Sequence, residues 1–184
     1  MNSDVVGKWV NIASRCAGFI EKQFDGQLAA AMDRPELFEQ AIAQADAIAA
    51  RYDAGEYSEA LRQIMALADA ANAYIAETAP WALAKDPTQR ERLHAVCTTA
   101  LNLFRVLTAY LKPVMPKVAH EAERFLNIVP LQWQAIATPT MKPMTTVVPK
   151  EIGMPVFFTY HQTVEVLKSP YFFPLAVTPS RGLS

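Results

Sequence analysis

Five runs of apolar residues follow one another over the first 126 residues, each with the three- and four-residue spacing of a helix that buries one face. The predicted buried faces, in chain order, are Val6, Trp9, Val10, Ala13, Ala17, Ile20 and Phe24; Phe38, Ala41, Ile42, Ala45, Ile48 and Ala49; Tyr57, Leu61, Ile64, Met65, Ala68, Ala71 and Ile75; Leu93, Val96, Cys97, Ala100, Leu101, Phe104, Leu107 and Leu111; and Val118, Ala122, Phe125 and Leu126. Short connections between such helices make neighbours antiparallel. The pattern therefore predicts an all-α fold, a bundle of about five helices.

Residues that start and stop helices mark the borders between these runs. Asp33 is placed to cap the second helix, with Pro35 near its first position. Pro80 ends the third helix, because proline lacks the N–H and clashes with the preceding turn. Asp86 and Pro87 open the fourth helix in the same way as the second.

The chain changes character after Thr138. Seven of its 13 prolines lie at or beyond Pro139, and the helical spacing disappears there. We expect two parts, a helical domain over residues 1–138 and an irregular or poorly ordered proline-rich tail over residues 139–184.

Composition narrows the class of protein. The 184 residues are 52% hydrophobic and 19% charged, which suits one folded domain and argues against disorder. The net charge of −1 excludes a strongly basic nucleic-acid binder. The charge is uneven, with seven acidic and two basic residues over 33–59, but seven basic and four acidic residues over 81–125. A polyanion would be repelled by the first stretch and tolerated by the second.

Metal, redox and membrane functions find little support. Cys16 and Cys97 are the only cysteines and form no C-x-x-C pair, so no zinc or redox motif is present. No apolar run reaches the length of about 18 residues that a membrane helix needs, and the first residues do not resemble a signal peptide. We expect a cytoplasmic protein without a membrane partner.

Catalytic motifs are also missing. The sequence has no glycine-rich phosphate loop, no G-x-S-x-G and no H-E-x-x-H. Glu91 and His94 form a single Glu-x-x-His step, whereas di-iron bundles need two such steps and two further glutamates. We expect no catalytic residue, metal site or cofactor in this chain, and expect His94, His120 and His161 to be surface or hydrogen-bonded histidines.

One face of the first predicted helix is a candidate binding surface. Asn11, Arg15, Gly18 and Lys22 lie together on the side opposite the apolar stripe. Asparagine offers a donor and an acceptor, and arginine offers a planar fork of donors. Gly18 costs about 1 kcal/mol relative to alanine inside a helix, which another backbone passing close by would explain. The commoner alternative is a solvated face with a tolerated glycine.

A second candidate is the corner formed by Pro80 and Trp81. A tryptophan that follows a helix-ending proline is more often core filler, but it can also be a platform for an unpaired base. Such stacking contributes about 1–3 kcal/mol per base. Lys85, four residues further on, could contact a phosphate. Trp9 and Trp133 have no such setting, so we expect them to be core or packing residues.

Five segments together resemble the anticodon-binding domain of the methionyl-tRNA synthetases, in order and in spacing, over about residues 2–136. The segments are 10–20 (VNIASRCAGFI), 24–26 (FDG), 64–69 (IMALAD) with Asn72 and Tyr74, 79–85 (APWALAK), and 102–107 (NLFRVL) with 110–116 (YLKPVMP). The resemblance implies the helical bundle of a class I synthetase anticodon domain.

The resemblance also implies a partner and a site. In that family the asparagine and arginine of the opening helix and the tryptophan after the proline read the CAU anticodon of methionine tRNA. These positions match Asn11, Arg15 and Trp81, with Pro80 shaping the same pocket. By the family's pattern, Trp81 stacks on the first anticodon base, a cytosine, while Asn11 and Arg15 hydrogen-bond its edges.

The chain departs from the family in one respect that bears on activity. The signatures H-I-G-H and K-M-S-K-S of the catalytic domain are missing, so sites for ATP and methionine are expected outside this chain, and no catalysis is expected from it alone. The alternative is a helical protein-interaction module, or a non-functional remnant, that kept the fold and lost tRNA binding. A separate catalytic chain as partner, and self-association, also remain open.

Overall fold

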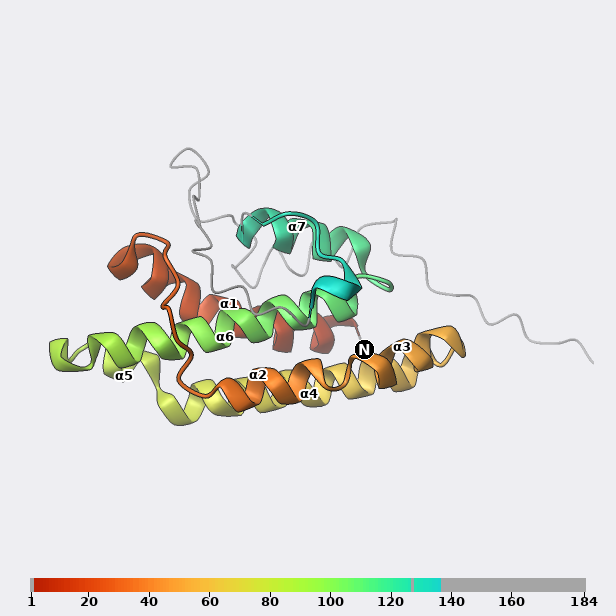
Figure 1. Cartoon of the computed structure of the whole chain (residues 1–184), viewed down its shortest axis with the longest axis horizontal. Helices are drawn as coiled ribbons and strands as arrows, with labels where there is room; N and C mark the ends of the chain where they lie inside the picture. The colour runs from red at the N-terminus through yellow and green to blue at the C-terminus, as the bar shows by residue number, and fades with distance from the viewer. Residues whose placement is uncertain (1, 127, 137–184) are drawn as a thin grey trace, which may run out of the picture.

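The computed structural model describes residues 2–126 and 128–136, and this part of the chain is built from helices (Figure 1). The α-helices are α1 (Asn2–Phe24), α2 (Pro35–Ile42), α3 (Ala45–Asp53), α4 (Tyr57–Thr78), α5 (Pro80–Leu83), α6 (Arg90–Leu111) and α7 (Pro116–Leu126). Two short 3-10 turns are η1 (Pro87–Gln89) and η2 (Trp133–Ala135). No strand occurs among the described residues, and the predicted all-α bundle is confirmed. The five predicted helices correspond to α1, α2 with α3, α4, α6 and α7.

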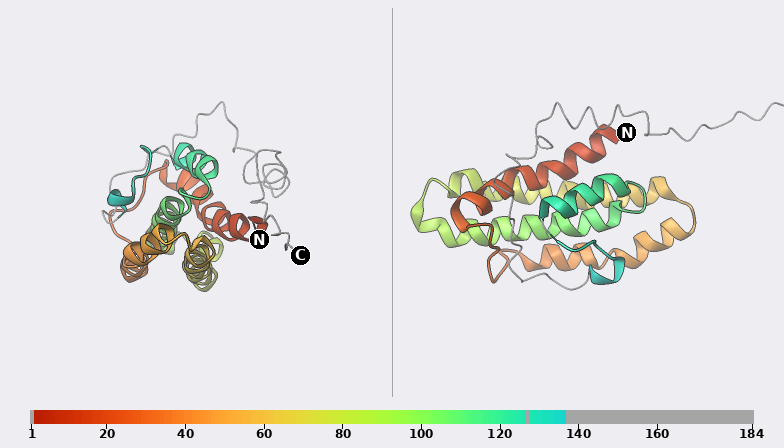
Figure 2. Two further views of the ribbon diagram at one scale, coloured as in Figure 1. Left: turned by 90° about the vertical axis from the view of Figure 1, so that its right-hand side faces the viewer. Right: turned by 90° about the horizontal axis from the view of Figure 1, so that it is seen from above.

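Helix α6 is the centre of the bundle. It packs against α1, α4, α2 and α7, and the end-on view shows these helices around it (Figure 2). The sequence predicts one buried stripe on this helix, but every residue from Val96 to Leu111 is buried. The polar side of α6 is covered as well, because helices from both earlier and later parts of the chain pack on it.

Buried and half-buried polar residues of α6 hold in place a connection that lacks secondary structure. Residues 25–34 link α1 to α2 and lie along α6, which supplies hydrogen-bonding side chains to their main chain. The bonds are Gln27 O to His94 Nε2 (2.7 Å), Ala29 N to Thr98 Oγ1 (2.9 Å) and Asp33 N to Thr99 Oγ1 (3.0 Å). His94 also stacks on Phe24 at 3.8 Å between ring centres, so it is the hydrogen-bonded histidine that we expect.

Two details of the second predicted helix differ from expectation. The helix is divided, because α2 ends at Ile42 and α3 begins at Ala45. Asp33 does not cap it: the residue at the cap position is Arg34, and no side chain bonds there. The Asp33 carboxylate instead accepts a hydrogen bond of 3.0 Å from the Tyr74 hydroxyl of α4, so a tertiary contact takes the place of the local one.

Trp9 is a core residue, and Trp133 is a partly buried residue that packs against the core, as predicted. Trp9 is 1% exposed, stacks on Phe104 at 4.8 Å, and donates from Nε1 to Thr108 Oγ1 at 3.2 Å. Trp133 lies against Tyr110, with ring centres 5.1 Å apart. Both contacts connect to α6, so they stabilise the packing of α1 and of residues 128–136 on the central helix.

Tyr57 is a correction to the predicted buried faces. Its side chain is 51% exposed, although the sequence places it on the inward stripe of α4. Tyr57 is the first residue of α4, at the end of the predicted stripe, and the centre of its ring lies 6.0 Å from that of Tyr52. The first and last residues of a helix can therefore be exposed even when helical spacing places them on the buried face.

A buried carboxylate fixes the last described segment. Glu123 of α7 is 2% exposed and accepts hydrogen bonds from Lys112 Nζ at 2.5 Å and from Leu131 N at 2.7 Å. Lys112 Nζ also donates to Leu131 O at 2.9 Å. This ion pair, with the main-chain groups of Leu131 bound to both partners, holds residues 128–136 against α6 and α7, while the second oxygen of Glu123, Oε2, accepts no hydrogen bond from the residues that the structure describes.

Two further expectations concern a membrane helix and the C-terminal part of the chain. None of the helices that the structure describes is long and apolar enough to cross a membrane. His161, the domain border at residue 138 and the tail over 139–184 lie outside the described residues.

Candidate nucleic-acid interface

The corner between α4 and α5 places Trp81 on the surface. Helix α4 ends at Thr78, and Ala79 adopts the left-handed conformation, with φ 45° and ψ 65°. A residue with a Cβ pays about 1 kcal/mol or more for this conformation, so the corner is locally strained. Pro80 cannot continue α4 and instead starts α5, where its fixed φ suits the first helical position. The chain therefore leaves the direction of α4 just before Trp81.

Trp81 is exposed, whereas Pro80, the residue before it, is buried. The side chain of Trp81 is 44% exposed, whereas Pro80 lies beneath the corner. The only other exposed large hydrophobic residues in the described part of the chain are Tyr57 and Val129. Trp81 is therefore not the core filler that the commoner interpretation predicts, and its ring is available to a ligand.

Arg15 meets this ring from another helix. The guanidinium carbon of Arg15, an exposed residue of α1, lies 5.7 Å from the centre of the Trp81 ring. This distance is within the range of a cation–π contact. The fold thus joins two residues that are far apart in sequence into one surface, which offers an aromatic face and a fork of hydrogen-bond donors.

Asn11 lies one turn before Arg15 on the same face of α1, and a second asparagine fixes its orientation. Asn11 Nδ2 donates to Asn72 Oδ1 of α4 at 2.9 Å. Asn72 Nδ2 in turn donates to Lys8 O at 2.8 Å and to Ala68 O at 2.9 Å. Since both N–H groups of Asn72 point to carbonyls, its oxygen must face Asn11. The oxygen of Asn11 and one of its N–H groups are left for a ligand.

Asn72 is the site residue that sequence reasoning missed. It lies inside one of the segments that carry the family resemblance, but no role was predicted for it. Nothing local distinguishes it from other polar residues of α4. Its role depends on the packing of α4 beside α1, which only the tertiary structure supplies.

Contacts between polar residues hold the last turn of α4 in place, just before the corner with α5. Arg34 forms a two-pronged ion pair with Glu77, one turn or less before the corner, and its guanidinium lies over the Tyr74 ring at 5.4 Å. The hydrogen bonds from Arg34 hold the pKa of Glu77 below its usual value. Thr78 Oγ1 donates back to Tyr74 O at 2.8 Å. These contacts fix the helix end from which the corner departs.

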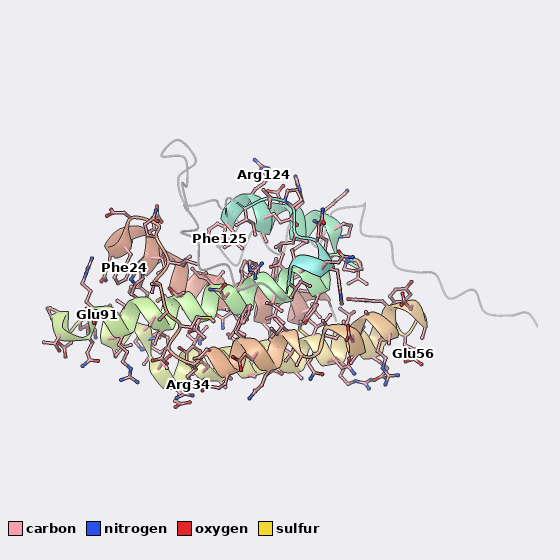
Figure 3. All side chains as sticks on the ribbon, in the orientation of Figure 1. Phe24, Arg34, Glu56, Glu91, Arg124 and Phe125 are labelled. Atoms are coloured by element: carbon pink, nitrogen blue, oxygen red, sulfur yellow. The ribbon has the colours of Figure 1, made fainter. Side chains whose placement is uncertain are left out.

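Three exposed cations lie at this end of the bundle, interspersed with the exposed acids Glu21, Asp25 and Asp86. Lys22 in the last turn of α1, Lys85 after α5 and Arg90 at the start of α6 are all exposed. Arg90 lies over the Phe24 ring at 4.7 Å, which shows that α1 ends beside the start of α6. Figure 3 labels Phe24 and Glu91 at this end and Glu56 at the opposite end. Exposed cations beside an aromatic platform suit a polyanionic strand.

Of the predicted site residues, the structure brings Arg15 and Trp81 into contact, places Asn11 one turn from Arg15, and buries Pro80 under the corner. The fold and the site together define an all-α bundle domain with an aromatic corner beside a polar helix face. Residues 26–156 match the sequence profile of a family described as the anticodon binding domain of methionyl tRNA ligase. The chain belongs to this family.

Similar proteins agree with the family. The chain is 60% identical over 134 residues to a methionine–tRNA ligase of Thiobacillus denitrificans, covering 73% of this chain and 19% of that protein. It is 52% identical over 138 residues to a methionine–tRNA ligase of Chromobacterium violaceum, covering 75% and 20%. The chain thus spans about one fifth of the length of these relatives.

Solved structures confirm the fold. The methionyl-tRNA synthetase of Mycobacterium tuberculosis in its free state matches with a TM-score of 0.67 at 23% identity, over 77% of this chain and 30% of that one. Its form bound to methionyl-adenylate matches with a TM-score of 0.68 over the same shares. The comparisons give no support to the alternative of an interaction module or a remnant without the tRNA role. They do not test the four site residues, which stay predictions.

Proposed function

We propose that the chain binds the anticodon loop of methionine tRNA, as the non-catalytic, RNA-recognising part of a methionyl-tRNA synthetase. The observation that carries the proposal is the half-exposed Trp81 ring with the Arg15 guanidinium 5.7 Å from its centre. Single-stranded loops are recognised by stacking of unpaired bases on aromatic rings and by hydrogen bonds to the base edges. This surface offers both kinds of contact in one place.

The hydrogen-bonding groups suit a cytosine as the stacked base. Because Asn72 takes one N–H of Asn11, the Asn11 oxygen is free to accept from the amino group of cytosine. Arg15 can donate to the ring nitrogen or carbonyl of the same base. Uracil has a carbonyl where cytosine has the amino group, so the Asn11 oxygen would face another acceptor. The first anticodon base of CAU is therefore the one we assign to Trp81.

The affinity of the isolated chain should be modest. One stacked base contributes about 1–3 kcal/mol, and each net hydrogen bond about 0.5–1.5 kcal/mol. The net charge of −1 adds little general attraction to phosphates. We expect a dissociation constant in the micromolar range or weaker, with a shallow dependence on salt.

Direct binding tests this proposal. A fluorescently labelled stem-loop with the methionine anticodon is titrated with the full 184-residue chain at low salt, and anisotropy is followed. Trp81→Ala should weaken binding by about 5- to 150-fold, the loss of one stacked base. Tyr57→Ala is the matched control, because it removes an aromatic ring of similar exposure at the other end of α4, a helix of 22 residues that is about 33 Å long.

A second stem-loop, with the first anticodon base changed from cytosine to uracil, tests the assigned base. Binding should weaken about tenfold or more, the effect of one lost base-edge contact. The proposal fails if the folded wild-type chain shows no saturable binding, or if Trp81→Ala and Tyr57→Ala bind equally well.

The activity of a whole synthetase would need other parts. We propose that sites for ATP and methionine belong to a catalytic domain that works with this chain, either as a separate partner or in a longer protein. Adding this chain to such a catalytic domain should raise aminoacylation of methionine tRNA, and Trp81→Ala should remove the increase. An equal increase with both chains would contradict a role for the anticodon surface.

A further inference from the structure

Gly18 has no structural reason to be glycine in the free protein. It lies inside α1, a helix of 23 residues, where glycine lowers stability relative to alanine. A Cβ built on Gly18 would meet no atom within 4 Å beyond its own helix. Its φ is not in the left-handed region either. Neither packing nor backbone conformation therefore requires the absence of a side chain.

The position of Gly18 places it within the candidate interface. It lies on the same face of α1 as Asn11 and Arg15, about 4.5 Å beyond Arg15 along the helix axis. Lys22 follows one turn later on that face, is exposed, and forms no ion pair with another residue that the structure describes. The missing side chain leaves open helix surface at Gly18, here called the notch, between Lys22 and Arg15, which contacts the Trp81 ring. The exposed Glu21 is the third charged neighbour of this surface.

We infer that the sugar–phosphate backbone of a bound RNA loop crosses α1 at Gly18, in contact with the helix main chain, with a phosphate at Lys22. This inference rests on the proposed function. A base stacked on Trp81 remains joined to its backbone, which must leave the platform within one nucleotide. The open, cation-flanked notch one turn from Arg15 is a surface that can accept it. A protein backbone could also use a glycine notch, but flanking cations and an exposed aromatic ring favour a polyanion.

Gly7 provides a matched control. It lies in α1 on the same face as Asn11 and Gly18, is exposed, and would also place a Cβ in open space. It is about 16 Å from Gly18 along the axis, on the side away from Trp81. Gly18→Ala and Gly7→Ala should both raise the melting temperature, because each removes a glycine from a helix without a clash.

The RNA titration separates the two variants. Gly18→Ala should weaken binding of the anticodon stem-loop by about tenfold, while Gly7→Ala should bind like the wild type. Lys22→Gln should lower the slope of log affinity against log salt by about one phosphate contact. Lys117→Gln on α7, near the far end of α6, should leave the slope unchanged.

The outcomes distinguish this inference from the function on which it rests. No saturable binding by the folded wild-type chain overturns both. If Trp81→Ala weakens the binding that the wild type shows, but Gly18→Ala binds within twofold of the wild type, the inference alone is overturned. The notch is then left to a protein partner. A Lys22→Gln slope equal to that of Lys117→Gln overturns the assignment of the phosphate.

Discussion

Removing the Asn72 side chain should weaken the contact between α1 and α4 and should also release the Asn11 amide from its fixed orientation. Asn72 accepts from Asn11 Nδ2 at 2.9 Å and donates to Lys8 O at 2.8 Å, so it makes two hydrogen bonds between α4 and α1. Its third bond, to Ala68 O, stays within α4. Asn72→Ala removes all three without adding volume, and leaves the Asn11 amide free to rotate.

The expected loss of stability follows from these contacts. Two interhelical hydrogen bonds contribute about 1–3 kcal/mol together. Alanine regains about 0.5 kcal/mol of helix propensity in α4. Asn72→Ala should therefore lower the free energy of unfolding by about 0.5–2.5 kcal/mol. In a double-mutant cycle with Asn11→Ala, the two losses should overlap by about 0.5–1.5 kcal/mol.

Urea unfolding followed by circular dichroism measures both quantities, provided that the m-value is unchanged. Arg62→Ala serves as the control, because Arg62 is an exposed residue of the same helix whose ion pair with Glu59 lies on the surface. The stem-loop titration should also show a smaller preference of Asn72→Ala for cytosine over uracil. A coupling energy below about 0.3 kcal/mol, with an unchanged base preference, would refute the role of Asn72 in orienting Asn11.

Two other predictions concern stability. Ala79→Gly should raise the free energy of unfolding by about 0.5–1 kcal/mol, because φ is 45° there; Ala82→Gly in α5 should not, and equal urea midpoints would contradict the strain at the corner. Burial raises the pKa of Tyr52 to about 12, so its neutral form is favoured in the folded chain. The resulting stability is complete below about pH 10 and is lost as the pH rises toward about 12. Tyr52→Phe should flatten this alkaline loss in unfolding measurements, and an unchanged slope would contradict it.

Part of the candidate site could be predicted from the sequence. Helical spacing alone places Asn11 and Arg15 on one outer face of α1, and the rule for proline places a turn just before Trp81. The family resemblance selects the same residues as the anticodon-binding set. The contact between Arg15 and Trp81, and the bond between Asn11 and Asn72, join helices that no local pattern pairs.

The sequence by itself determined the all-α class, the five helical elements and most of the buried faces, because helical periodicity and helix-breaking residues act over a few positions. The tertiary structure alone decided that α6 is buried on all sides, that Asp33 bonds to Tyr74 instead of capping α2, and that Tyr57 is exposed. Each of these depends on which distant segment covers a given face. Polar groups on a helix carry no local sign of the partner that will satisfy them, so their roles appear only when the helices pack.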